Sequence, residues 1–110
     1  MKVTFLGTGT STGIPTIGVK RESCLSSDKR DNRLRSSILI EYKSKSILID
    51  CGPDFRQQML RINKTKIDAI FFTHEHADHT AGLDDVRPIS FHHGKIPIYA
   101  HQRVVDNLKI

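Results

Sequence analysis

Three histidines and two carboxylates stand within six residues, directly after a short apolar run. The run is Ile70-Phe71-Phe72, and the cluster is His74-Glu75-His76-Ala77-Asp78-His79. Imidazole nitrogens and carboxylate oxygens are the ligands that zinc and similar divalent cations accept. Protonated histidines crowded together would repel one another, so such a cluster needs a reason to exist. Its place at the end of a strand, where α/β sheets bind ligands, predicts a metal site.

The spacing within the cluster restricts its backbone. In an extended segment, residues two apart point the same way, so His74 and His76 can share one metal. On a helix the two side chains would lie about 200° apart and would not converge. Asp78 and His79 are adjacent and need a turn to aim together, which would let them serve a second metal nearby. We therefore expect the first part of a dinuclear site, with Asp78 also as the candidate catalytic residue.

A metal pair of this kind would carry hydrolytic chemistry. Two cations about 3.5–4 Å apart can bridge a hydroxide and neutralise a phosphoryl or carbonyl oxygen under attack. The expected cofactors are two divalent ions, with zinc as the first choice and manganese or iron as alternatives. Glu75 and Ala77 alternate with the ligands, so we expect both to point away from the metals.

Length and composition limit the other functions. The chain has 110 residues, 37% of them hydrophobic and 26% charged, which suits one domain over residues 1–110 with a modest core. Its apolar stretches are far shorter than the ~20 residues of a membrane helix, and its start lacks a signal-peptide pattern. We expect a cytoplasmic protein without membrane contact. Cys24 and Cys51 form no C-x-x-C pair, so we expect free thiols.

The net charge of +5 is unevenly spread. Residues 1–66 contain 13 Lys and Arg against six Asp and Glu, whereas residues 67–110 contain four against six. A basic half beside an acidic, ligand-rich half would suit an anionic, phosphate-bearing substrate held near metal ions. A solvated basic surface is the simpler explanation of the charge taken alone.

The hydrophobic pattern places strands first and helices later. Strands are expected at residues 3–6, 37–42, 46–50, 67–72 and 96–100, with the second and third forming a hairpin. Helices are expected at residues 53–63, 80–86 and 102–108, the second ending near Pro88. Residues 18–35 show no sustained period, and we expect a long loop there. The succession predicts an α/β layered fold.

Three motifs, in this order, resemble the metallo-β-lactamase superfamily. They are Phe5-Leu6-Gly7-Thr8-Gly9, Leu48-Ile49-Asp50-Cys51-Gly52, and His74-x-His76-x-Asp78-His79 after its strand. The resemblance implies an αββα sandwich, of which this chain would be the N-terminal half, a mixed sheet with flanking helices. It implies His74 and His76 on one zinc, and Asp78 and His79 on the other. It also implies that Asp50 is a buried residue that supports the metal ligands through hydrogen bonds.

The opening loop looks most like that of the PhnP-type phosphodiesterases within this superfamily. The segments that carry the likeness are Gly7 to Pro15 and Asn32-Arg33-Leu34-Arg35-Ser36-Ser37. That group cleaves cyclic phosphates and related phosphodiesters, which implies a phosphate-bearing small molecule or a nucleotide as substrate. Thr8, Ser11, Arg33 and Arg35 are the candidate phosphate contacts. Val19 and Arg21 stand where members of the group often have the cysteines of an extra structural zinc site.

Other functions remain open. The transfer-RNA 3′-processing endonucleases share the opening loop and the histidine motif, and a thioester, lactone or β-lactam hydrolase is a further enzyme class. The family's domain is about twice this length, and its later half supplies the remaining metal ligands. His92, His93 and His101 match no standard metal site. The chain alone could therefore be an inactive half-domain that binds metal weakly and self-associates through an exposed sheet face.

Overall fold

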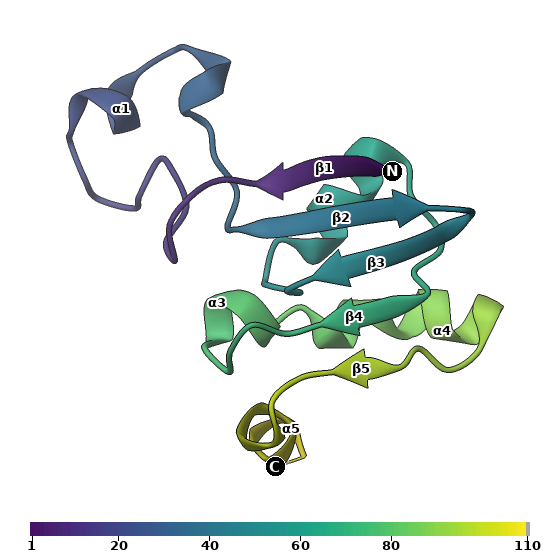
Figure 1. Ribbon diagram of the computed structural model, residues 1–110. Helices are drawn as coiled ribbons and strands as arrows, with labels where there is room; N and C mark the ends of the chain where they lie inside the picture. Colours follow the sequence, from purple (N-terminus) through teal and green to yellow (C-terminus); the bar gives the residue numbers. More distant parts are fainter. Residues whose placement is uncertain (110) are drawn as a thin grey trace.

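A computed structural model describes residues 1–109, which form one mixed sheet with helices (Figure 1). The strands are β1 (Lys2–Gly7), β2 (Ser37–Tyr42), β3 (Lys45–Ile49), β4 (Ala69–Phe71) and β5 (Ile98–Tyr99). They lie side by side in chain order. The β1–β2 and β2–β3 pairs are antiparallel, and the β3–β4 and β4–β5 pairs are parallel. The predicted α/β fold, with its hairpin and mixed sheet, is confirmed.

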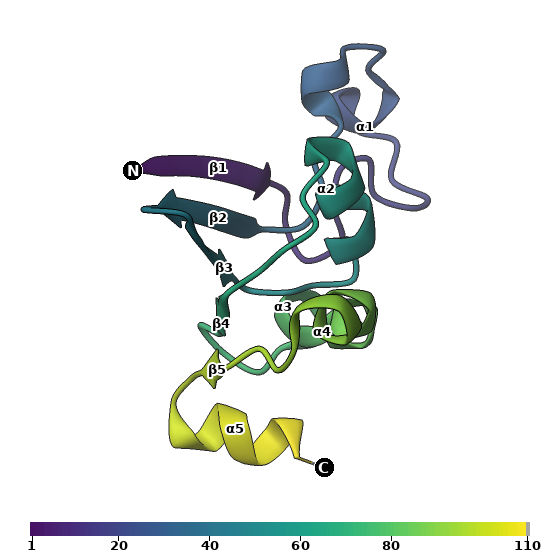
Figure 2. The same ribbon diagram turned by 90° about the vertical axis from the view of Figure 1, so that its right-hand side faces the viewer.

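Helices fill most of the connections between and after the strands. They are α1 (Glu22–Leu25), α2 (Phe55–Ile62), α3 (Ala77–Thr80), α4 (Arg87–His93) and α5 (Gln102–Leu108), with 3-10 turns at Lys29–Asp31 and Leu83–Val86. Figure 2 shows α2 and α4 on one side of the sheet and α5 beyond the β5 edge. The helices predicted at residues 53–63 and 102–108 are present. Across residues 1–109, no helix combines the length and the apolar character needed to cross a membrane.

The segment after the histidine cluster differs from its prediction. The hydrophobic pattern predicts one helix over residues 80–86 that ends near Pro88, but the structure has α3, a 3-10 turn and then α4. Pro88 lies in the first turn of α4. Its missing N–H is tolerated there, because the first N–H groups of a helix have no partner within it. The proline therefore begins a helix instead of ending one.

The core lies between the sheet and the helices α2 and α4. Alternate strand residues point to this side, and Leu39 and Leu48 at its centre have no exposed surface. Phe55 and Met59 of α2 and Ile89 of α4 belong to the same buried cluster. Each such side chain contributes roughly 1.5–3 kcal/mol when it is removed from water. This packing holds the end of β3 and the start of α2 in fixed positions beside β4.

The opposite face of the sheet is apolar, and no described helix covers it (Figure 2). The strand register places these side chains on it: Val3, Phe5, Ile38, Ile40, Ile47, Ile49, Phe71 and Tyr99. Phe5 is 65% exposed and Tyr99 is 51% exposed. The Phe71 and Tyr99 rings stack with their centroids 4.8 Å apart. We call this surface the open face, and an apolar surface of this kind is typical of an association site.

Candidate metal centre

A tight turn after β3 sets the position of Asp50. Its φ of +64° lies in the left-handed region, which Asp and Asn adopt more readily than other non-glycine residues. The Asp50 N–H donates to the carbonyl oxygen of Phe71 at 2.8 Å, which ties the turn to the end of β4. Only 5% of Asp50 is exposed. Its carboxylate is therefore a buried acceptor group beside the loop that follows β4.

The Asp50 carboxylate accepts hydrogen bonds from two residues of that loop. The Thr73 N–H donates to Oδ1 at 2.8 Å, and the Thr73 hydroxyl donates to Oδ2 at 2.7 Å. Nδ1 of His79 lies 2.7 Å from the same Oδ2. Because a carboxylate can only accept, a neutral His79 ring carries its proton on Nδ1 and leaves Nε2 free. The contacts that the predicted supporting role of Asp50 requires are present, and the role itself stays a prediction.

The backbone after Asp50 packs against the same loop. The Cys51 N–H donates to the His79 carbonyl oxygen at 2.8 Å, and the Gly82 N–H donates to the Cys51 carbonyl oxygen at 2.9 Å. A Cβ atom on Gly52 would collide with the carbonyl oxygen of Asp78. Glycine is therefore required for this close approach. We call residues 73–82 the histidine loop.

The four predicted ligands come together in the histidine loop. Ligand atoms of His74, His76 and Asp78 all lie within 4.8 Å of one another. His79 joins them, because its Nε2 is 3.0 Å from Oδ2 of Asp78, and its ring centroid is 4.1 Å from that of His74. His74 and His76 precede α3, whereas Asp78 and His79 lie in it. The backbone thus has the extended segment and the turn that the spacing predicts.

The donor set fits a divalent cation. Nε2 of a neutral His79 and Oδ2 of Asp78 both present lone pairs, 3.0 Å apart. Two such atoms repel unless a proton or a cation lies between them. His76 is exposed and the other three side chains are half-buried, so the cluster is open to solvent. Zinc, manganese and iron all accept imidazole and carboxylate ligands, and the division of the four residues between two metals stays a prediction.

The other histidines and Glu75 do not point toward the four predicted ligands. Glu75 turns toward α5, where its Oε2 lies 3.2 Å from Nη2 of Arg103. Its pKa is lowered, chiefly by a hydrogen bond from its own backbone. His101 accepts the Arg103 N–H at the start of α5, and His92 and His93 are exposed on α4. Among residues 1–109, these three histidines do not belong to the group of converging ligand atoms.

Cys51 adjoins Asp50 but has the properties of a core residue. Burial, assisted by the negative charges of Asp85 and Asp50, raises the pKa of its thiol to about 12. A thiol of this kind stays protonated at neutral pH, and metal binding and nucleophilic attack both need the thiolate. Cys24 and Cys51 are free thiols, as the sequence predicts.

The four candidate phosphate contacts lie together beside the start of α2. Nη1 of Arg33 donates to the Thr8 hydroxyl at 2.9 Å, and Nε of Arg35 donates to the Ser11 carbonyl oxygen at 2.7 Å. Arg35 also donates from its backbone and from Nη1 to Asp54, at 2.8 and 3.1 Å. We call these five residues the arginine cluster. The structure brings them together but already engages several of their donors within the fold.

Two residues of these networks are missing from the sequence prediction. Thr73 directly precedes the first histidine, and a hydroxyl next to a ligand was the available signal. Asp54 lies at the start of α2, where acidic residues are common because they favour the positive end of the helix dipole. Its position at the start of a helix does not by itself indicate a contact with Arg35, which is 19 residues away in the chain.

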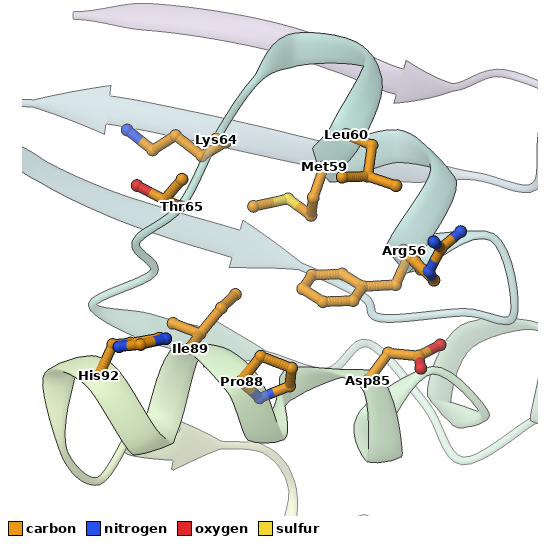
Figure 3. Close-up of a pocket in the computed structure, with 10 residues that line it drawn as sticks. Arg56, Met59, Leu60, Lys64, Thr65, Asp85, Pro88, Ile89 and His92 are labelled. Atoms are coloured by element: carbon orange, nitrogen blue, oxygen red, sulfur yellow. The ribbon is translucent and has the colours of Figure 1, made fainter.

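An apolar groove lies elsewhere, between α2 and α4 (Figure 3). It has a volume of about 340 Å³, and Met59, Ile89 and Pro88 are among the side chains that line it. Arg56 and His92 stand at its sides. The groove includes no residue of the histidine loop or of the arginine cluster. The candidate metal centre is therefore separate from it, at the end of the sheet where α3 lies (Figure 1).

Comparison with known proteins gives relatives that bear on this site. A family profile described as "Beta-lactamase superfamily domain" matches residues 45–109. A crystal structure described as a new diphosphatase from the PhnP family is 51% identical, with a TM-score of 0.93, and the match covers 97% of this chain and 44% of that chain. Ribonuclease Z of Methanococcus maripaludis is 34% identical over 101 residues, which are 89% of this chain and 28% of that protein.

A further relative carries a different name. It is an octanoyltransferase of Porphyromonas gingivalis, 47% identical over 110 residues, which cover 99% of this chain and 22% of that protein. The chain spans less than half the length of each of these three relatives. Each of these names describes the whole of a much longer protein. For the activity of this chain, the names only support a proposal.

Proposed function

We propose that this chain, which belongs to the metallo-β-lactamase superfamily of hydrolases, holds the first metal ligands of a phosphodiesterase. The observation that carries the proposal is the convergence of His74, His76, Asp78 and His79 beside one buried carboxylate. The likeness to a PhnP-family diphosphatase supports a phosphorus-containing substrate. The substrate class is a cyclic or other phosphodiester of a small molecule or a nucleotide. Residues 1–110 would be the N-terminal half of the catalytic domain.

In this proposal the ligands use the atoms that the fold leaves free. When bound, two divalent ions, zinc first and manganese or iron as alternatives, would supply an activated water and neutralise charge on the phosphoryl group. Asp50 holds His79 in one tautomer and one orientation, with Nε2 turned to Asp78. Asp78 serves both as a ligand and as the catalytic carboxylate, because its oxygens can accept a proton from water.

Within the arginine cluster, Arg33 is the best candidate to bind the substrate phosphate. A guanidinium has five N–H donors, and Arg33 directs one of them to Thr8. Arg35 is more engaged, because Asp54 and Ser11 take donors from both its side chain and its backbone. We therefore assign Arg33, with the Thr8 and Ser11 hydroxyls, to phosphate binding, and Arg35 to holding the loop that carries them.

Hydrolysis of a bis-aryl phosphodiester by the zinc-loaded full-length protein, in which residues 1–110 would form the N-terminal half of the catalytic domain, tests the proposed substrate class. We expect turnover that a chelator abolishes and that His76→Ala reduces by at least about 100-fold, since a metal ligand is lost. His92→Ala is the matched control, because His92 is an exposed histidine on α4, and its turnover should equal that of the wild type. Turnover of thioesters, lactones or β-lactams without any phosphodiester hydrolysis would overturn the proposal.

A transfer-RNA 3′-processing endonuclease is the second candidate, and the identity with ribonuclease Z favours it. A precursor transfer RNA with a labelled 3′ extension separates the two candidates. Under the first proposal, small phosphodiesters are hydrolysed and the precursor is left intact. Cleavage of the precursor, with no turnover of small phosphodiesters, would give preference to the endonuclease.

The open face favours a further property, self-association of this chain. Its exposed aromatic side chains would leave water if two copies met face to face. Phe5→Lys should therefore shift the chain toward the monomer in size-exclusion chromatography. Phe91→Lys is the control, because Phe91 is 82% exposed but lies on α4, and we expect it to change nothing. A monomeric wild-type chain with full turnover would exclude an inactive, associating half-domain.

A further inference from the structure

We infer that Thr73 is a positioning residue that sets the tautomer of His74 and thereby keeps Nε2 of this histidine free for a metal ion. The inference rests on the proposed function in one respect, since it takes His74 as a metal ligand. Thr73 lies outside the predicted ligand set, and its role follows from three hydrogen bonds.

The first step is the direction of the hydrogen bonds at the Thr73 hydroxyl. Its Oγ1 lies 2.7 Å from Oδ2 of Asp50 and 2.8 Å from Nδ1 of His74. A hydroxyl has one proton to donate and lone pairs with which to accept. The carboxylate of Asp50 can only accept, so the hydroxyl proton points to Asp50. The oxygen of Thr73 must then accept from His74, which places a proton on Nδ1 of that ring.

The second step is the consequence for metal binding. A neutral imidazole carries its proton on either nitrogen, and the partner of one nitrogen decides whether the other is free. Asp50 fixes His79 directly through Nδ1, and it fixes His74 through the Thr73 hydroxyl. One buried carboxylate therefore prepares two histidines in the same way, each with Nε2 available. Without the hydroxyl, His74 would populate both tautomers and rotate more freely.

The third step is that the side chain of Thr73 can be changed without removing its backbone contact. The Thr73 N–H donates to Oδ1 of Asp50 whatever the side chain is. Thr73→Val replaces the hydroxyl by a methyl group of similar size, and Thr73→Ser keeps the hydroxyl. Thr73→Ala serves as a second deletion of the hydroxyl in case valine disturbs the fold.

The experiment measures two quantities on the 110-residue chain and on these variants. Nitrogen-15 NMR of the imidazole rings gives the tautomers of His74 and His79 in the metal-free protein. Competition with a chromophoric chelator gives the zinc affinity. We expect Nδ1–H at both histidines in the wild type and in Thr73→Ser. In Thr73→Val and Thr73→Ala, His74 should become a mixture while His79 is unchanged, and zinc should bind about 10–100-fold more weakly.

Several results would overturn the inference. One is that His74 keeps Nδ1–H without the hydroxyl, and another is that Thr73→Ser loses as much affinity as Thr73→Val. A change at His79 equal to that at His74 would indicate general disruption and also counts against it. The tautomer measurement needs no metal. An absence of zinc binding in the wild type would therefore defeat the proposed function, while the role of Thr73 in setting the His74 tautomer is still tested. Conversely, normal zinc binding and turnover without the tautomer effect would defeat only the role of Thr73.

Discussion

The histidine loop and the arginine cluster stand at the same end of the sheet (Figure 1), yet they use their polar groups in opposite ways. In the histidine loop, Asp50 engages Nδ1 of His79, the nitrogen that a metal bound at Nε2 does not need. In the arginine cluster, Ser11 and Asp54 engage two guanidinium donors of Arg35, which are then not available to a phosphate. The hydrogen bonds of the histidine loop leave Nε2 of His79 free for a ligand. Those of the arginine cluster engage donors of Arg35 within the fold.

The difference shows how to judge polar side chains in a site. The residue type says which chemistry a side chain can perform, and its hydrogen bonds say which of its atoms remain free for that chemistry. By this criterion the histidine loop is the stronger candidate for function. In the arginine cluster Arg33 commits one guanidinium donor, whereas Arg35 commits two together with its backbone N–H and is the more engaged of the pair.

The largest effect should come from removing the charge at Asp50. Asn tolerates the left-handed backbone of this position, but its NH2 group would face donors that need an acceptor. We expect Asp50→Asn to weaken zinc binding by about 10–100-fold and to lower the free energy of unfolding by about 1–3 kcal/mol. Chelator competition and urea denaturation measure the two quantities.

The matched variant is Asp54→Asn in the arginine cluster. It removes a carboxylate that also accepts from a side chain and a backbone N–H, so it should lower stability by about 1–2 kcal/mol. Its zinc affinity should equal that of the wild type. Equal losses of zinc affinity in the two variants would break the distinction between the regions.

A comparable loss of stability is expected where Gly52 meets the histidine loop. A Cβ at this position collides with the Asp78 carbonyl oxygen, so Gly52→Ala must displace Asp78. We expect a loss of about 1–3 kcal/mol in unfolding free energy together with weaker zinc binding. Gly94→Ala is the control, because its Cβ would meet no atom although its φ is +87°. It should cost about 1–3 kcal/mol through backbone strain alone and leave zinc binding unchanged.

The smallest effect concerns the two thiols. The N–H of Thr16 lowers the pKa of the Cys24 thiol, whereas burial raises that of Cys51 to about 12. At pH 8, iodoacetamide should therefore modify Cys24 quickly and Cys51 only after denaturation, which mass spectrometry detects. Equal rates in the folded chain would contradict the buried position of Cys51.

The raised pKa of Cys51 also predicts how stability depends on pH. The folded state holds its proton more tightly than the unfolded state, whose thiol titrates near its ordinary value of 9.0. Stability from this group is complete below pH 9 and falls as the pH rises toward 12. Urea denaturation at pH 8 and pH 10 checks the sign.

Much of the fold was predictable because its signals are local. Two runs of Ile and Leu at 38–40 and 47–49, joined by a short polar segment, indicate a hairpin whichever fold surrounds it. The prediction was wrong at Pro88, because proline is common both just after the end of a helix and in the first turn of a helix. The packing of α4 against the core, which decides between them, involves residues distant in the chain.

The candidate site also combines local signals, which the sequence shows, with long-range contacts, which it does not show. Its four predicted ligands occupy six successive residues, so their types and spacing could be recognised together. The role of Thr73 depends on a contact with Asp50 across 23 residues, and the engagement of Arg35 depends on Asp54 across 19. Sequence order does not reveal which donors such contacts engage, and so it indicates the candidate ligands more readily than the groups around them.

The central claim is that the histidine loop binds a divalent metal ion through imidazole and carboxylate. X-ray absorption at the zinc edge, on this chain with one equivalent of zinc, tests it most directly. We predict a shell of nitrogen and oxygen neighbours at about 2.0–2.1 Å with the outer scattering of imidazole rings, and weaker imidazole scattering in His76→Ala. Sulfur at about 2.3 Å, or a spectrum that His76→Ala leaves unchanged, would contradict the claim.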